Sequence, residues 1–106
     1  MKKNDQMFIN HILDAISKIE DYLKDVLYDD FIEDDMRIDA VVRELEIIGE
    51  AVKNLSSEFK NKRKHIPWKE ISGMRDKLTH EYFGVDLQIV WNTCKEDILI
   101  LKKELK

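Results

Sequence analysis

The sequence contains little cysteine, proline or glycine, and each shortage excludes a class of protein. One cysteine, Cys94, excludes an internal disulfide framework and fits a reducing compartment. One proline and three glycines leave few sharp turns. No segment resembles a signal peptide, and no apolar run approaches the roughly 20 residues of a membrane-spanning helix. We therefore expect a cytoplasmic protein without a membrane segment.

What is present fits a single domain, residues 1–106. Apolar residues make up 43% of the chain and charged residues 38%, which is too apolar for a disordered protein. The formal net charge of −4 argues against a protein that coats nucleic acid by bulk electrostatics. The charge is uneven, however, because the window 60–69 contains no acid and five bases: Lys60, Lys62, Arg63, Lys64 and Lys69. This basic window is either a solvated loop or a local patch that contacts phosphates.

Apolar residues recur at helical spacing along most of the chain and predict four main helices. We place them at about residues 5–27, 38–55, 67–83 and 87–105, with residues 56–66 as a short polar helix or loop. The acidic stretch 28–35 supplies aspartates that can cap the second helix, and Asp86 can cap the fourth. No stretch alternates with period two for long enough to form a strand. The predicted fold class is all-α: an antiparallel bundle of four main helices with short extra turns.

Several residues have a structural interpretation. Cys94 lies on an apolar stripe and is expected to be an inert core thiol, while Trp68 and Trp91 are expected to be packing anchors. Gly49 interrupts the second helix at a cost of about 1 kcal/mol relative to alanine, which favours close approach of another backbone or of a site. The histidines at 11 and 65 have no ligand partners at metal spacing, so no metal or cofactor is expected.

The stretch "RDKLTHEY", residues 75–82, gathers an arginine, a histidine and a tyrosine. On the third predicted helix Arg75 falls on an apolar stripe, where it must pair with an acid such as Glu50, bind an anion or face a partner chain. His80 lies roughly 140° away from Arg75 on an ideal helix. The two side chains therefore converge only if the helix unwinds or if two chains of a dimer contribute.

The residue types in this stretch suit phosphodiester chemistry. A histidine near a helix C-terminus is a ready general acid or base, and the planar fork of an arginine holds a phosphate. Without metal ligands or a glycine-rich loop, the nucleophile would come from the substrate, as the 2′-OH of RNA does. The spacing alone also fits a purely structural histidine and arginine.

Residues 74–91, "MRDKLTHEYFGVDLQIVW", resemble the signature of the HepT-like branch of the HEPN superfamily. The family motif is arginine, four residues, histidine, any residue, tyrosine, and Arg75, His80 and Tyr82 match every fixed position. Asp76 matches the polar residue that often follows the arginine. The segments "EIIGEAVKNL" (46–55) and "IPWKEI" (66–71) also resemble this branch and occur in the expected order.

The resemblance implies an all-helical homodimer with a composite site in the cleft between the chains. It implies a metal-independent ribonuclease toxin in which Arg75 and His80 are the essential pair. It also implies a minimal nucleotidyltransferase (MNT) antitoxin that transfers AMP to Tyr82, where a bulky anion would repel RNA. Apart from the resemblance, we expect Asp76 to orient one of the essential pair, while Glu50 either orients Arg75 or has no role in the site. Two alternatives stay open. One is a non-catalytic helical partner of the nucleotidyltransferase that binds nucleotide or partner in the same cleft, which the acidic net charge favours. The other is a dimerisation protein without a substrate.

Overall fold

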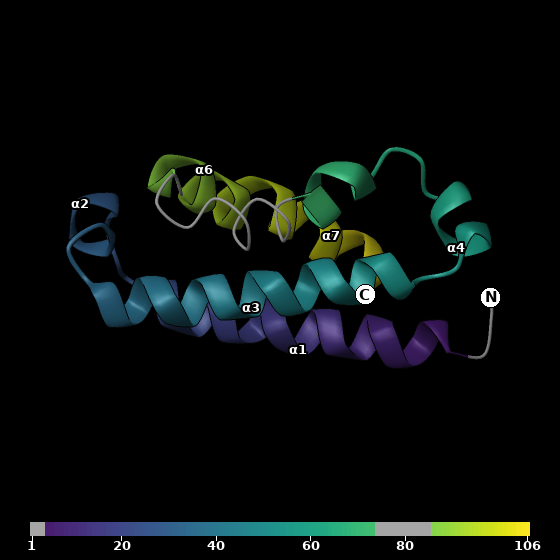
Figure 1. Ribbon diagram of the computed structural model, residues 1–106, viewed down its shortest axis with the longest axis horizontal. Helices are drawn as coiled ribbons and strands as arrows, with labels where there is room; N and C mark the ends of the chain where they lie inside the picture. The colour runs from purple at the N-terminus through teal and green to yellow at the C-terminus, as the bar shows by residue number, and fades with distance from the viewer. Residues whose placement is uncertain (1–3, 74–85) are drawn as a thin grey trace.

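The computed structural model describes residues 4–73 and 86–106. Within these residues the secondary structure is helical throughout and no strand occurs, which confirms the all-α class. Two long antiparallel helices, α1 (Asp5–Leu23) and α3 (Asp35–Asn54), pack side by side and form one layer (Figure 1). The C-terminal helices run along one side of this layer (Figure 1). In the described part of the chain no helix is long and apolar enough to cross a membrane.

The first helix is shorter than its apolar pattern predicts. It ends at Leu23 rather than at about Leu27, because Asp25 adopts a positive φ of 59°, which a right-handed helix cannot accommodate. A short helix that the sequence did not predict, α2 (Tyr28–Phe31), follows at the end of the molecule (Figure 1). It forms within the acidic stretch because Phe31 turns inward and is fully buried.

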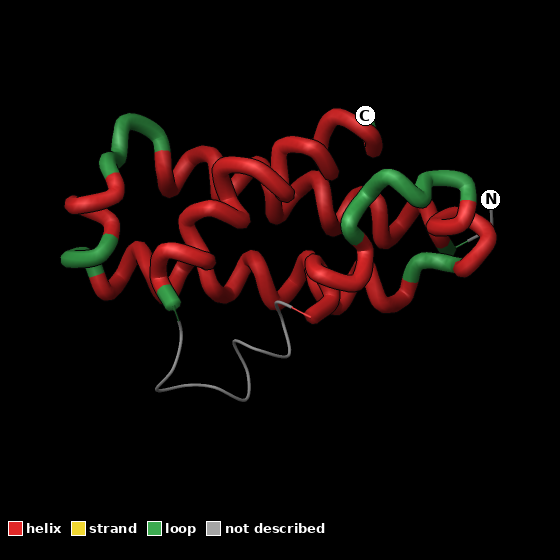
Figure 2. Tube along the Cα trace, turned by 90° about the horizontal axis from the view of Figure 1, so that it is seen from above, coloured by secondary structure: helices red, strands yellow, loops and turns green. Residues whose placement is uncertain are grey.

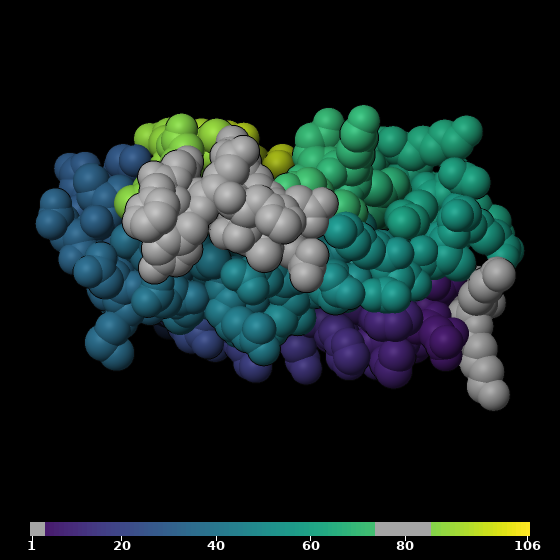
Figure 3. All heavy atoms as spheres, in the orientation of Figure 1, coloured from purple at the N-terminus to yellow at the C-terminus, as the bar shows by residue number. Residues whose placement is uncertain are grey.

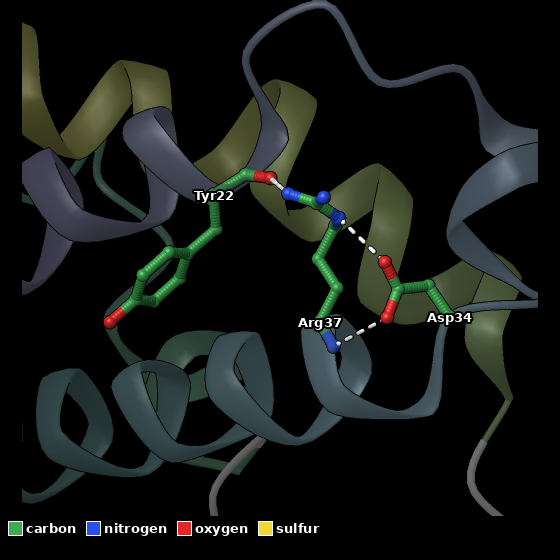
Figure 4. A network of polar contacts seen from close by, with 3 residues as sticks. All are labelled: Tyr22, Asp34 and Arg37. Carbon is green, nitrogen blue, oxygen red and sulfur yellow. Dashed lines mark hydrogen bonds and ion pairs between the residues drawn. The ribbon is translucent and has the colours of Figure 1, made fainter.

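The connection between α1 and α3 is held by an arginine and an aspartate (Figure 4). Asp34 caps α3: its Oδ1 accepts from the backbone N of Arg37 at 3.1 Å, and its Oδ2 accepts from Arg37 Nε, also at 3.1 Å. Arg37 Nη1 also donates to the carbonyl oxygen of Tyr22 in the last turn of α1. The backbone N–H of Arg37, together with its side chain, lowers the pKa of Asp34. The predicted aspartate cap is therefore confirmed, and it also ties two helices together.

The start of α1 is tied to the next short helix, α4 (Ser57–Asn61). Asp5 is 1% exposed, and its two carboxylate oxygens accept from the backbone N and the Oγ of Ser56 at 2.8 and 2.7 Å. The same Oγ accepts from the backbone N of Phe59 at 3.1 Å and so caps α4. The range 56–66, predicted as a short polar helix or loop, contains both: Ser57–Asn61 is helical and turns follow it. The buried carboxylate of Asp5 fixes the place of this helix.

The C-terminal segment is one long helical run with a wider turn in its middle. It consists of α6 (Leu87–Asn92), a π-helical turn η2 (Thr93–Asp97) and α7 (Ile98–Leu105). Val90, Ile98 and Leu101 on this run join Ile12 and Ile48 in a single hydrophobic core, each no more than 1% exposed. Figure 2 shows this run alongside the two long helices from above.

The two tryptophans act as packing anchors, as the sequence predicts. Trp91 packs against Phe31 and Tyr28, with ring centroids 5.3 and 5.6 Å apart. Trp68 packs against Phe59 with centroids 6.2 Å apart. The two contacts join the C-terminal run to α2, and the residues after Pro67 to α4.

Candidate functional site

The motif residues Arg75, Asp76, His80 and Tyr82 lie between residues 74 and 85, outside the described residues. The structure describes the chain on both sides of them. Residues 68–73 are helical, as the third predicted helix requires at its start, and Asp86 begins the segment that follows. The structure therefore shows how the two ends of the motif segment are anchored.

The upstream anchor is built on Trp68. Its indole Nε1 donates to the carbonyl oxygens of Lys60 and Arg63, at 3.2 and 3.0 Å, so the indole is fixed to the turn that precedes it. The next helical turn begins with a hydrogen bond from the backbone N of Ile71 to the carbonyl oxygen of Pro67, at 3.1 Å, and Ile71 is buried. The helix that leads into the motif thus starts from a fixed position.

The downstream anchor is the predicted cap. Asp86 Oδ1 accepts from the backbone N of Gln88 at 2.9 Å and of Ile89 at 3.3 Å. These bonds satisfy two of the first N–H groups of α6, which have no partner within the helix. The prediction that Asp86 begins the fourth helix is confirmed.

The π-helical turn after α6 carries an acid that the sequence did not single out. Burial raises the pKa of Asp97, and the neighbouring charges of Glu96 and Glu70 raise it further. Because Glu70 belongs to the helical residues 68–73, its effect indicates that this segment lies close to the π turn. Wider turns of this kind are frequent at functional sites. A π-helical turn contains one more residue than an α-helical turn. The regular alternation of apolar residues along 87–105 does not predict this extra residue.

Cys94, in the same turn, is not a nucleophile. Its side chain is buried, and burial raises the pKa of the thiol to about 12. Only the thiolate attacks or binds metal, and at neutral pH this group stays protonated. The prediction that Cys94 is a core thiol is confirmed, and its burial favours the unreactive, protonated form.

Glu50, the predicted support for Arg75, lies on α3 in a cleft of about 310 Å³ between α1 and α3. His11, Arg43 and Glu46 line the same cleft, so two carboxylates, an imidazole and a guanidinium share it. The predicted contact between Glu50 and Arg75 lies outside the described residues, because Arg75 is not among them. The other non-motif histidine, His65, has its Nε2 3.1 Å from Glu104 Oε1. Across residues 4–73 and 86–106, no group of three or more His, Cys, Asp or Glu side chains is arranged to hold a metal ion.

Comparison with protein families gives one match that covers most of the chain. Residues 12–106 match the family model HepT-like, described as "Ribonuclease HepT-like". The matched range includes the whole motif segment and both of its anchors. No solved structure matches the chain.

Several proteins are similar to this chain over most of its length. "Gamma-glutamylcyclotransferase and putative RNase MJ0434" of Methanocaldococcus jannaschii is 51% identical over 105 residues, which cover 99% of this chain and 47% of that protein. "Putative RNase TTE0752" of Caldanaerobacter subterraneus subsp. tengcongensis is 47% identical over 98% of this chain and 93% of its own length. "Probable ribonuclease HepT" of Thermococcus cleftensis is 46% identical over 96% and 93%. The chain thus spans about half the length of the first relative and nearly all of the other two.

Proposed function

This chain belongs to the ribonuclease HepT-like family, and we propose that it is a metal-independent endoribonuclease, the toxin of a toxin–antitoxin pair. The observation that carries the proposal is the family match, because it spans the motif residues Arg75, His80 and Tyr82. The names of the three relatives above each include RNase or ribonuclease, which supports RNA as the substrate.

In the proposed reaction the RNA supplies its own nucleophile. His80 takes the proton of the 2′-OH, the 2′ oxygen attacks the adjacent phosphorus, and the bond to the 5′ oxygen breaks. The departing 5′ oxygen takes up a proton, which leaves a 2′,3′-cyclic phosphate and a 5′-OH. Arg75 binds the scissile phosphate and stabilises the charge that develops on it, and Asp76 orients one of the two.

Cleavage is therefore expected to persist in EDTA and to leave 2′,3′-cyclic phosphate ends. The proposed mechanism needs no bound metal, because a positioned histidine moves the proton and an arginine neutralises the phosphate. A 5′-labelled RNA, incubated with the protein in excess EDTA and resolved beside alkaline hydrolysis products, checks this. Magnesium-dependent cleavage with 3′-OH products would contradict the mechanism.

The active form is proposed to be a homodimer of four-helix antiparallel bundles with the site in the cleft between chains. Arg75 and His80 diverge on one straight helix, so a second copy is the simplest source of a convergent pair. Multi-angle light scattering at micromolar concentration is expected to give the mass of two chains. A monomer that still cleaves RNA would remove the composite site.

The proposed partner is a minimal nucleotidyltransferase antitoxin that silences the toxin by transferring AMP to Tyr82. Tyr82→Phe removes only the hydroxyl, so the variant is expected to fold, to keep much of its activity and to gain no AMP when co-expressed with the enzyme. Intact-mass measurement of the purified chain checks this, with Tyr82→Phe expressed alone as the reference mass and co-expressed wild type as the chain expected to gain AMP. A Tyr82→Phe chain that still gains AMP would place the modification on another residue.

The runner-up function is a non-catalytic partner of a nucleotidyltransferase that uses the same cleft to bind nucleotide or partner. The net charge of −4 favours this alternative, because RNA is itself an anion. The two functions predict different charge around the motif. A basic surface beside it would favour RNA, and an acidic or apolar surface would favour the protein partner.

A further inference from the structure

We propose that a pocket between α4 and the helical residues 68–73 binds the phosphate backbone of single-stranded RNA beside the motif segment. The pocket has a volume of about 680 Å³, and three lysines line it: Lys60, Lys64 and Lys69. We call it the basic pocket. This inference rests on the proposed ribonuclease function, and it concerns how substrate is held rather than how it is cleaved.

The basic window divides into cations that are engaged within the fold and cations that face solvent. Arg63 donates to the carbonyl oxygen of Phe59 at 3.2 Å, and its guanidinium lies 3.8 Å from the centre of the Phe59 ring. Lys62 Nζ lies 3.6 Å from Glu58 Oε1, and Lys60 Nζ donates to the carbonyl oxygen of Val52 at 3.3 Å. These contacts leave Lys64 and Lys69 as the cations best placed to meet an incoming phosphate.

Lys64 and Lys69 are both exposed, and both line the basic pocket. Within residues 4–73 and 86–106 neither of them forms an ion pair. One acid, Glu70, lines the pocket against three lysines, so the lining is net positive. An ammonium group binds phosphate as a compact point charge without base preference, which suits a backbone site.

The walls of the pocket are fixed before any ligand arrives. Ile66 and Pro67 lie between its two sides, and Ile66 is buried in the core. The indole of Trp68 donates to Lys60 and Arg63 carbonyl oxygens, which holds the turn between α4 and the next helix. A site whose backbone is already ordered loses less conformational entropy on binding.

The shape of the basic pocket fits a polymer. It is broad, and most of its lining residues are exposed or half-buried, whereas small ligands are usually enclosed. Figure 3 shows residues 57–73, coloured teal to green, as one continuous surface at a corner of the molecule. A strand can cross such a surface and continue beyond it.

The pocket is close to the motif along the chain. Ser72 lines it and precedes Arg75 by three residues. Three residues of chain span at most about 11 Å. A phosphate held by Lys64 and Lys69 would therefore lie a short length of RNA backbone away from the scissile phosphate.

The test compares two double variants that each lose two positive charges. Lys64→Gln/Lys69→Gln removes the exposed cations of the basic pocket, and Lys18→Gln/Lys24→Gln removes two exposed lysines of α1 and its C-terminal end. The probe is a fluorescent 2′-O-methyl RNA oligonucleotide, which has no 2′-OH and cannot be cleaved by the proposed reaction. Fluorescence anisotropy over a salt series gives the affinity and its salt dependence.

The pocket variant is expected to bind about 10–30-fold more weakly at 0.1 M salt, and its log–log salt slope is expected to fall by about 1.4, since each phosphate contact on a single strand contributes about 0.7. The α1 variant is expected to stay within about twofold of wild type, because its charges act only at long range. With unmodified RNA, the pocket variant is expected to raise KM and to leave kcat within about twofold, because no proton-transfer group has been removed. Both variants should melt like wild type by circular dichroism, since all four lysines are exposed.

The outcomes separate the two proposals. Two outcomes would overturn the basic pocket: RNA affinity falls equally in both double variants, or it does not fall in the pocket variant. If wild type still cleaves RNA, either outcome leaves the ribonuclease function standing. A wild-type protein that binds the 2′-O-methyl RNA through Lys64 and Lys69 but leaves unmodified RNA intact would overturn the ribonuclease function and support the pocket.

Discussion

His80→Ala is expected to lower the rate of RNA cleavage by about 10²–10⁴-fold, the usual effect of losing a positioned general acid or base. Arg75→Ala is expected to lower it by about 10²–10³-fold, because the charge that develops on the phosphate loses its stabilising partner. Single-turnover cleavage of a fluorescent RNA measures both effects. The protein is used at a concentration that saturates the RNA, so that a lower rate reports slower chemistry rather than weaker binding.

Lys77→Ala is the matched control for these two substitutions. Lys77 lies in the same segment, between Arg75 and His80, but at no fixed position of the motif. The Lys77→Ala variant is expected to cleave at close to the wild-type rate. All three variants are expected to keep the helical circular dichroism spectrum of wild type and, by light scattering, the same oligomeric state. If His80→Ala cleaves at the wild-type rate, the catalytic role is wrong and the non-catalytic partner function should replace it.

The helices could be predicted from the sequence wherever apolar spacing and a local cap agree. The second and fourth helices are of this kind, because Asp34 and Asp86 accept backbone N–H groups at their first turns. The end of α1 could not be predicted, since its apolar pattern continues past Leu23 while Asp25 turns the backbone into the left-handed region. The short helix α2 was not predicted either. Its acidic residues interrupt the apolar pattern, and only the structure shows that Phe31 is buried in the core.

For the candidate site, the sequence predicts which residue types are present but not which distant residues lie close together in the fold. The alternation of apolar residues along the C-terminal run shows Cys94 on a buried face, and burial then accounts for its protonated thiol. Asp97 could not be found this way, because its raised pKa depends on burial and on Glu70, which is 27 positions away along the chain. The motif residues Arg75 and His80 were found by their resemblance to a family pattern, and their roles stay predictions.

Asp5→Ala is expected to lower the free energy of unfolding by about 2–4 kcal/mol. The wild-type carboxylate is buried and accepts two hydrogen bonds from Ser56, so its removal leaves a backbone N–H and a hydroxyl without their acceptor. Urea denaturation followed by circular dichroism measures the change. Asp14→Ala, an exposed aspartate on the same helix, is the control and should stay within about 0.5 kcal/mol of wild type. Equal midpoints for Asp5→Ala and Asp14→Ala would show that the Ser56 bonds add nothing to stability.

Asp5→Asn is expected to fall between wild type and Asp5→Ala, because an amide oxygen can still accept from the backbone N of Ser56. The loss of stability in Asp5→Ala is expected to be greatest at α4. Ser56 caps this helix by accepting from the backbone N of Phe59, and the Phe59 ring packs against Trp68. That series of contacts runs from the start of α1 to the helix that leads into the motif. Hydrogen exchange followed by mass spectrometry is therefore expected to show faster exchange over residues 56–61 in Asp5→Ala than over α3, since a locally weakened unit opens before the rest of the fold. Uniform acceleration over both helices would mean that Asp5 stabilises the whole fold rather than the attachment of α4.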